Sequence, residues 1–226
     1  FQAPFTGGAG ALSGHSPDIY SSAGITGSPG WVVQTAGLAL TGAGFVAPTV
    51  AGVENLHAIE MEQVSLAAGY SIFASGRINA SSGGSFGMSW MLTSEIDDPY
   101  VSIAVQQYDA AQAEIYLRAF DSAHAEYLAG PFLRPYGPFA YEINITGSLA
   151  RSDIDGEIVQ TIGMGIGGEL SGSDRIAYLG AYKDNDTGSN EVAISEVGVV
   201  LGAAGPNYTI SSEFLIEDFT TGGAAD

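Results

Sequence analysis

Cysteine is absent from this 226-residue sequence, which excludes disulfide bonds and thiol chemistry from its folding and its function. Long apolar runs are absent too. No run approaches the roughly 20 apolar residues that a membrane-spanning helix needs, so we expect no membrane insertion. The chain begins at Phe1 and not at methionine, which indicates processing, trimming or further residues before Phe1, and no signal peptide is readable.

Positive charge is scarce. Six basic residues face 25 acidic ones, which gives a formal net charge of −19. Such a chain repels nucleic acid phosphates and anionic membranes, so we expect no nucleic acid partner. The charge suits solubility at high salt, cation binding or contact with a basic surface. A halotolerant or marine surface without a specific partner is the simplest explanation.

Short alternating segments dominate what is present. Hydrophobic residues make up 46% of the chain and charged residues 14%, which indicates a folded protein. About a dozen segments resemble strands and no segment is clearly helical, so the sequence predicts an all-β, two-sheet antiparallel β-sandwich. We assign residues 1–202 to this domain. Residues 203–226 begin with an apolar stretch and are predicted to be a C-terminal docking tail with a frayed end.

Several strand predictions are specific. Residues 139–145 alternate most cleanly between apolar and other side chains. Residues 38–40 and 45–47 are predicted to form a hairpin. Residues 100–108 and 114–120 are predicted to pair with one another, with an alanine-rich helix as the weaker alternative. Residues 130–138 contain three prolines, and we expect them to break all regular structure.

The predicted strand over residues 86–93 combines large and small side chains. Phe86, Met88 and Trp90 alternate with Gly87 and Ser89. Because side chains alternate between the two faces of a strand, Gly87 and Ser89 are expected to face a crowded or a wet side.

The N-terminal segment 5–31 is rich in glycine and has no helical pattern. Its large apolar residues, Phe5, Leu12 and Trp31, need a buried environment. A chain that spends many residues between three such anchors is predicted to lie across a folded surface. We interpret the segment as an initial strand followed by a long surface strap that is pinned by Trp31.

Two stretches carry a resemblance to a known family. The segment F-T-G-G-A-G-A-L-S-G-H-S-P-D, followed by the strand at Trp31, resembles the start of concanavalin-A-like (laminin-G-like) jelly-roll modules in tailed-bacteriophage virion proteins and related bacterial surface proteins. The segment A-I-S-E-V-G-V-V-L-G resembles the closing strand of that family, which returns beside the first strand. The resemblance implies a jelly roll on a capsid or tail surface, with other virion proteins as partners. A homotrimer is expected by analogy only.

An acidic loop is the candidate metal site. Asp184, Asp186, Asn190 and Glu191 offer the hard oxygen ligands that Ca²⁺ prefers. The segment opens as D-x-D but lacks the spacing and the terminal glutamate of an EF-hand. The alternatives are a Ca²⁺ site and an ordinary polar hairpin tip, and we expect no other cofactor.

A second acidic segment, residues 95–98, resembles part of the E-x-D-x-x-E strand of laminarinase-type glycosidases. Tyr100 stands where the third acid would be, and Pro99 interrupts the strand. Retaining hydrolysis needs two carboxyl groups about 5 Å apart. We therefore interpret the segment as an acidic turn and predict no catalytic residues.

Three aromatic residues, Tyr100, Phe132 and Tyr136, fall near predicted loops. Exposed rings there would stack on sugars or contact a partner, whereas buried rings would close the core. The function that fits best is a non-enzymatic virion structural or decoration protein of a tailed phage that can contact host surface glycans. The alternatives are a carbohydrate-binding module of a secreted, extracellular bacterial protein and, less well supported, a laminarinase-like glycosidase.

Overall fold

The computed structural model describes residues 2–5, 8–14, 31–62, 70–79, 86–95, 98–120, 125–146, 149–154, 157–163, 174–184 and 192–201. All regular structure in these ranges is β. The described strands are β1 (Gln2–Pro4), β2 (Gly10–Ala11), β3 (Val32–Thr35), β4 (Leu38–Leu40), β5 (Val46–Pro48), β6 (Glu54–Glu62), β7 (Tyr70–Ile78), β8 (Phe86–Glu95), β9 (Asp98–Gln107), β10 (Gln112–Phe120), β11 (Glu126–Pro135), β12 (Gly137–Thr146), β13 (Leu149–Ile154), β14 (Glu157–Gly163), β15 (Asp174–Lys183) and β16 (Val192–Leu201).

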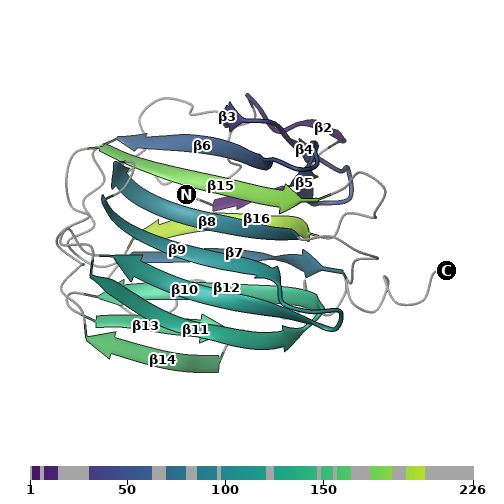
Figure 1. Ribbon diagram of the computed structural model, residues 1–226. Helices are drawn as coiled ribbons and strands as arrows, with labels where there is room; N and C mark the ends of the chain where they lie inside the picture. Colours follow the sequence, from purple (N-terminus) through teal and green to yellow (C-terminus); the bar gives the residue numbers. More distant parts are fainter. Residues whose placement is uncertain are drawn as a thin grey trace.

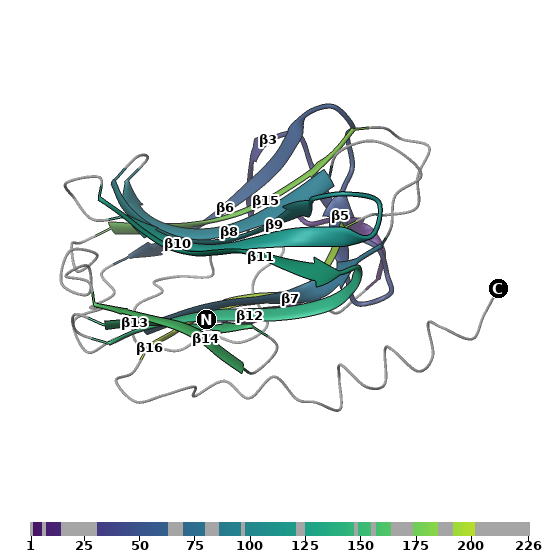
Figure 2. The ribbon, with the colours of Figure 1, turned by 60° about the horizontal axis from the view of Figure 1, so that its bottom comes forward.

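These strands form two antiparallel sheets that pack face to face (Figure 1). The nine-stranded sheet has the order β14-β13-β12-β7-β16-β5-β4-β2, with β1 paired to β16, and the seven-stranded sheet has the order β11-β10-β9-β8-β15-β6-β3. Figure 2 shows that the strands of the seven-stranded sheet curve, so that its outer face is concave. The predicted all-β sandwich with a concanavalin-A-like jelly-roll architecture is confirmed. No helix in the described part of the chain is long and apolar enough to cross a membrane.

The core lies between the two sheets and is built by alternating side chains. On β7, Tyr70, Ile72 and Ala74 point into the core, and the alternating core residues of the neighbouring strand β12 lie beside them as cross-strand pairs. Trp90 on β8 is fully buried, and its Nε1 donates a hydrogen bond to the carbonyl of Gly198 on β16, 3.2 Å away. One hydrogen bond therefore joins the two layers through the core.

The N-terminal anchors are buried as predicted. Phe5, Leu12 and Trp31 are each at most 4% exposed. The ring centroid of Trp31 lies 6.0 Å from that of Phe5 and 6.2 Å from that of Trp90. Strand β1 pairs with β16, so the closing strand does return beside the first one. Residues 15–30 of the predicted strap lie outside the described ranges.

The prediction that residues 130–138 break all regular structure was wrong, because β11 runs through them. Strand β11 is the outermost strand of its sheet, and an edge strand tolerates proline. The pairing register with β10 shifts between Ile115 and Leu117, which leaves Gly130 and Pro131 together opposite one residue. Gly130 has a φ of 115°, and a Cβ there would lie 2.4 Å from the Ile115 carbonyl oxygen. The bulge therefore requires glycine.

The other specific strand predictions are confirmed. Strands β4 and β5 form the expected hairpin, and β9 pairs with β10 where a helix was the alternative. The C-terminal segment 203–226 lies outside the described residues, so its assignment as a docking tail stays a prediction.

Candidate functional site

Small residues line the centre of the concave outer face of the seven-stranded sheet. Gly180 on β15 lies opposite Ser89 on β8, which lies opposite Ala104 on β9. Gly87, two residues before Ser89 on β8, lies opposite Gln106 on β9. Because these positions alternate with core residues, their short side chains face outward. Gly87 and Ser89 were expected to face a crowded or a wet side, and both line an open pocket, while a Cβ at Gly87 would also lie only 3.1 Å from the Val105 carbonyl oxygen.

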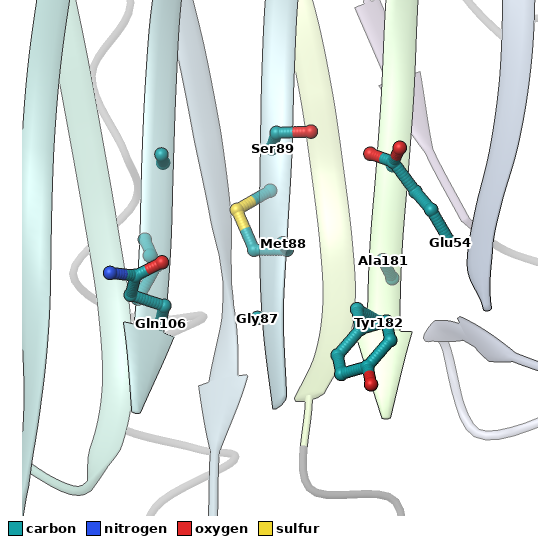
Figure 3. Close-up of a pocket in the computed structure, with 10 residues that line it drawn as sticks. Glu54, Gly87, Met88, Ser89, Gln106, Ala181 and Tyr182 are labelled. Atoms are coloured by element: carbon teal, nitrogen blue, oxygen red, sulfur yellow. The ribbon is translucent and has the colours of Figure 1, made fainter. Parts of the chain in front are cut away.

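These small residues leave a solvent-open pocket of about 190 Å³ in the sheet surface (Figure 3). Pockets for drug-sized ligands typically measure about 300–1,000 Å³, so this one fits a single ring-sized unit of a ligand. The residues that line it are Glu54, Gly87, Met88, Ser89, Ala104, Val105, Gln106, Gly180, Ala181 and Tyr182.

Gly180 forms the floor of the pocket between two polar side chains. A Cβ added there would lie 2.8 Å from Oγ of Ser89 and 2.9 Å from Oε1 of Glu54. The two side chains lean toward one another over this glycine from the strands on either side (Figure 3). Any side chain at position 180 would fill the space between them, so the pocket depends on glycine here.

A series of polar contacts fixes the rim near β9 and β10. Nε2 of Gln106 donates to Oε1 of Glu114, and the hydroxyl of Tyr116 donates to Oε2 of the same carboxylate at 3.0 Å. The Arg118 guanidinium lies 4.5 Å from the centroid of the Tyr116 ring, a favourable cation–π geometry. Burial, and next the hydrogen bond to Glu114, raises the pKa of Tyr116. Glu114 thus holds an amide and an aromatic ring in place at once.

Tyr182 is the aromatic residue among those that line the pocket, and it lies across the pocket from Gln106. It lies on β15, opposite Glu54 in the register. Its hydroxyl donates a hydrogen bond to Oδ1 of Asp184, and this bond raises the pKa of Tyr182. The ring is therefore held by its tip and can act as a stacking surface for a sugar.

The lining contains one carboxylate, that of Glu54. Glycoside hydrolysis needs two carboxyl groups about 5–9.5 Å apart. Glu114 is four strands away from Glu54, or roughly 19 Å at the usual strand spacing, so these two cannot form such a pair. What the pocket can do is accept hydrogen bonds through Glu54, Gln106 and Ser89 beside an aromatic ring.

The predicted aromatic contacts lie elsewhere. Phe132 and Tyr136 are partly buried and pack against the core, and the Tyr136 ring centroid lies 5.8 Å from that of Phe86. Burial raises the pKa of Tyr136. The backbone of Tyr100 lies in β9 opposite Phe120, and its side chain is outside what the structure describes. Neither Phe132 nor Tyr136 is among the residues that line the pocket, and the assignment of all three to glycan or partner contact stays a prediction.

The predicted calcium loop is described only at its first residue. Asp184 is exposed and accepts the hydrogen bond from Tyr182, while Asp186, Asn190 and Glu191 lie outside the described residues. The parts of the chain that the structure describes contain no cluster of three or more metal-ligating side chains. The calcium assignment therefore stays a prediction.

The two ends of the acidic segment 95–98 lie on paired strands. Strand β8 ends at Glu95, β9 begins at Asp98, and these two residues pair with one another. The chain thus reverses where the glycosidase motif would continue along one strand.

The sequence singled out Gly87 and Ser89 as facing a crowded or a wet side, but it predicted no pocket there and none of the other lining residues. Glu54, Gln106 and Tyr182 carried no motif. The signal that could have found them is the strand register, in which Gln106 and Tyr182 both lie opposite Gly87 and Glu54 lies opposite Tyr182. These positions appear only once the strands are paired.

Comparisons with known proteins agree with the fold. No family model matches the sequence, and no curated protein matches it. Among solved structures, the CBM2 module of the evolved Dit of Lactobacillus casei BL23 phage J-1 is similar, with a TM-score of 0.54 at 11% identity over 88% of this chain and 93% of that one. A glycoside hydrolase family protein from Mycobacterium thermorestibile gives 0.54 at 13% identity over 88% and 99%. An immunostimulatory antigen and pseudo beta-1,3-glucanase of Mycobacterium tuberculosis gives 0.52 at 12% identity over 90% and 98%. At these identities the similarity establishes the jelly-roll fold.

Proposed function

We propose that this chain is a non-enzymatic virion protein of a tailed phage that contacts host surface glycans through the pocket at Gly180. The observation that carries the proposal is the open pocket on a concave sheet, whose rim combines fixed hydrogen-bonding groups with a tyrosine ring. Sugars present hydroxyl groups at the edge of the ring and apolar C–H groups on its faces, so such a rim is complementary to them.

The phage setting is supported by the N-terminal resemblance and by the fold shared with the phage Dit module. Among the described residues that line the pocket, Glu54 is the one carboxylate, which favours binding over hydrolysis. The proposed partners are other virion proteins, and the proposed assembly is a homotrimer on the capsid or tail surface. A monomer by light scattering would count against that assembly.

The glycan proposal is tested on a glycan array with matched glycine variants. Gly180→Val fills the pocket floor and should lower binding at least tenfold. Gly10→Ala is the control, because a Cβ at Gly10 meets no atom within 4 Å. Gln106→Ala, an exposed position on the rim, should weaken binding severalfold without affecting folding. Absence of binding to any glycan would contradict the proposal, as would equal binding by Gly180→Val.

The virion setting needs a separate experiment, because a carbohydrate-binding module of a secreted bacterial protein would give the same array result. Immunogold labelling with an antibody against the purified chain distinguishes them. Gold on capsids or tails of phage particles supports the proposal, whereas label confined to secreted protein or bacterial surfaces supports the alternative.

A further inference from the structure

The orientation of the Gln106 amide decides which of its two ends faces a ligand. Its Nε2 donates to Oε1 of Glu114 on β10. Figure 3 shows the amide nitrogen turned away from the pocket and the amide oxygen turned toward Gly87. A planar amide whose nitrogen is engaged on one side must present its oxygen on the other. Glu114 thereby turns Gln106 into a hydrogen-bond acceptor at the rim.

The opposite wall also presents acceptors. The Glu54 carboxylate reaches over the pocket floor, with Oε1 2.9 Å from the position that a Gly180 Cβ would take. An ionised carboxylate can only accept hydrogen bonds. The hydroxyl of Ser89 beside it can donate or accept. A ligand therefore meets acceptors from β6 and from β9, and apart from the Ser89 hydroxyl it has to supply the donors itself.

Positive charge does not offset these acceptors within the pocket. The ten lining residues include no lysine, arginine or histidine. On the neighbouring strand β10, Arg118 stacks on the Tyr116 ring, and its Nε lies 3.6 Å from Oε1 of Glu126. The chain as a whole has a formal charge of −19. A negatively charged ligand would thus enter a negative site on a negative protein.

We infer that the pocket selects uncharged, hydroxyl-rich sugar units and rejects sugar units that carry a carboxylate. The Glu54 carboxylate repels a carboxylate on the sugar, and the Gln106 amide oxygen accepts a hydrogen bond from a sugar hydroxyl. Glu114 acts as a positioning residue by fixing the Gln106 amide. This inference rests on the proposed glycan-binding function and adds the class of sugar to it. An ammonium group, as on an amino sugar, would be accepted at least as well as a hydroxyl group, because it brings donors and the opposite charge.

The test uses pairs of polysaccharides that differ at C6, where one member carries a hydroxymethyl group and the other a carboxylate. Neutral β-glucan, galactan and mannan are each compared with the same polymer oxidised at C6 to the uronate, by calorimetry and at low salt. Wild-type protein should bind the neutral member of at least one pair ten times or more tightly than its oxidised form. Raising the salt from about 0.05 to about 0.5 M should narrow that ratio by screening and leave neutral binding nearly unchanged.

Three variants assign the roles. Glu54→Gln should narrow the neutral-to-oxidised ratio severalfold. Glu114→Gln should weaken neutral binding severalfold, because a glutamine there can also donate and lets the Gln106 amide turn over. Glu126→Gln is the control, since it removes the same charge from an exposed position outside the pocket and should leave the ratio unchanged.

The possible outcomes distinguish failure of this inference from failure of the proposed glycan-binding function. Binding of neutral and oxidised polymers with equal affinity would overturn the inference and leave glycan binding intact. A ratio that Glu54→Gln and Glu126→Gln change equally would also overturn it, because net charge alone would then explain the selectivity. If no polysaccharide of either kind binds, the proposed function fails, and the inference fails with it.

Discussion

The outer faces of the two sheets differ in how far solvent reaches their side chains. On the seven-stranded sheet, outward side chains such as Gln106 and Tyr182 are exposed or half-buried and border an open pocket, although Thr93, Ser102 and Tyr178 further along the same face are buried. On the nine-stranded sheet, the outward positions of β7 and β12 are closed, with Phe73 at 0%, Ser71 at 5% and Glu142 at 4% exposure. Both faces carry small and polar residues, so composition alone does not separate them.

The hydrogen bonds of the closed face are made among its own residues. Nδ2 of Asn144 donates to Oγ of Ser71 at 2.8 Å, and the hydroxyls of Ser75 and Ser195 lie 3.0 Å apart. Buried polar groups need such partners, and the bonds they form are structural. On the open face, the corresponding bonds fix the rim of a pocket. This contrast is why we assign ligand contact to the seven-stranded sheet.

The largest effect should come from Phe73→Ala on the closed face. Phe73 is fully buried and lies outside the core between the sheets, so its loss should cost about 3–5 kcal/mol of unfolding free energy. Leu133→Ala is the control on the open-face sheet, because Leu133 is 41% exposed, and should cost less than about 1 kcal/mol. Urea denaturation measures both. Similar costs for the two variants would remove the contrast between the faces.

A smaller effect should separate two serines. Ser71→Ala removes the acceptor of a buried hydrogen bond and should cost about 1–2 kcal/mol. Ser89→Ala on the pocket floor should stay within about 0.5 kcal/mol and change ligand binding instead. The same denaturation series tests both, with Phe73→Ala as the internal scale. A Ser71→Ala protein as stable as the wild type would show that this face opens to water in solution.

Most of the fold was predictable because strand alternation is a local signal. Strand β12 alternates so cleanly that its core residues were evident, and the glycine-rich turn between β4 and β5 marked a hairpin. Strand β11 was missed because its prolines are tolerated only at a sheet edge, and the position of a strand within its sheet is not written in its own residues. The same limit applies to Phe73, whose burial depends on chain outside β7.

The pocket was less predictable because its residues meet through pairing between distant strands. Ser89 and Gly180 lie on neighbouring strands although they are far apart in the sequence, and Glu54 comes from a third strand, beyond β15. Ser89 was expected only to face a crowded or a wet side. Its partners follow from the order β8-β15-β6, and nothing in the three separate segments fixes that order.

The smallest predicted effect is on the pKa of Tyr116, at the rim of the pocket. The pKa of Tyr116 is raised above its ordinary value, first by burial and then by Glu114. Since the folded chain then holds this proton more tightly than the unfolded chain, the stabilisation is complete below the ordinary tyrosine pKa of about 10 and is lost as the pH rises through the raised value. Glu114→Gln should move the Tyr116 pKa back toward its ordinary value, though not completely, because burial remains. Ultraviolet titration of tyrosinate, with Tyr116→Phe subtracted, measures the shift. If the two proteins titrate identically, Glu114 does not hold the Tyr116 hydroxyl in solution, and the rim of the open face is less rigid than the buried hydrogen bonds on the other sheet.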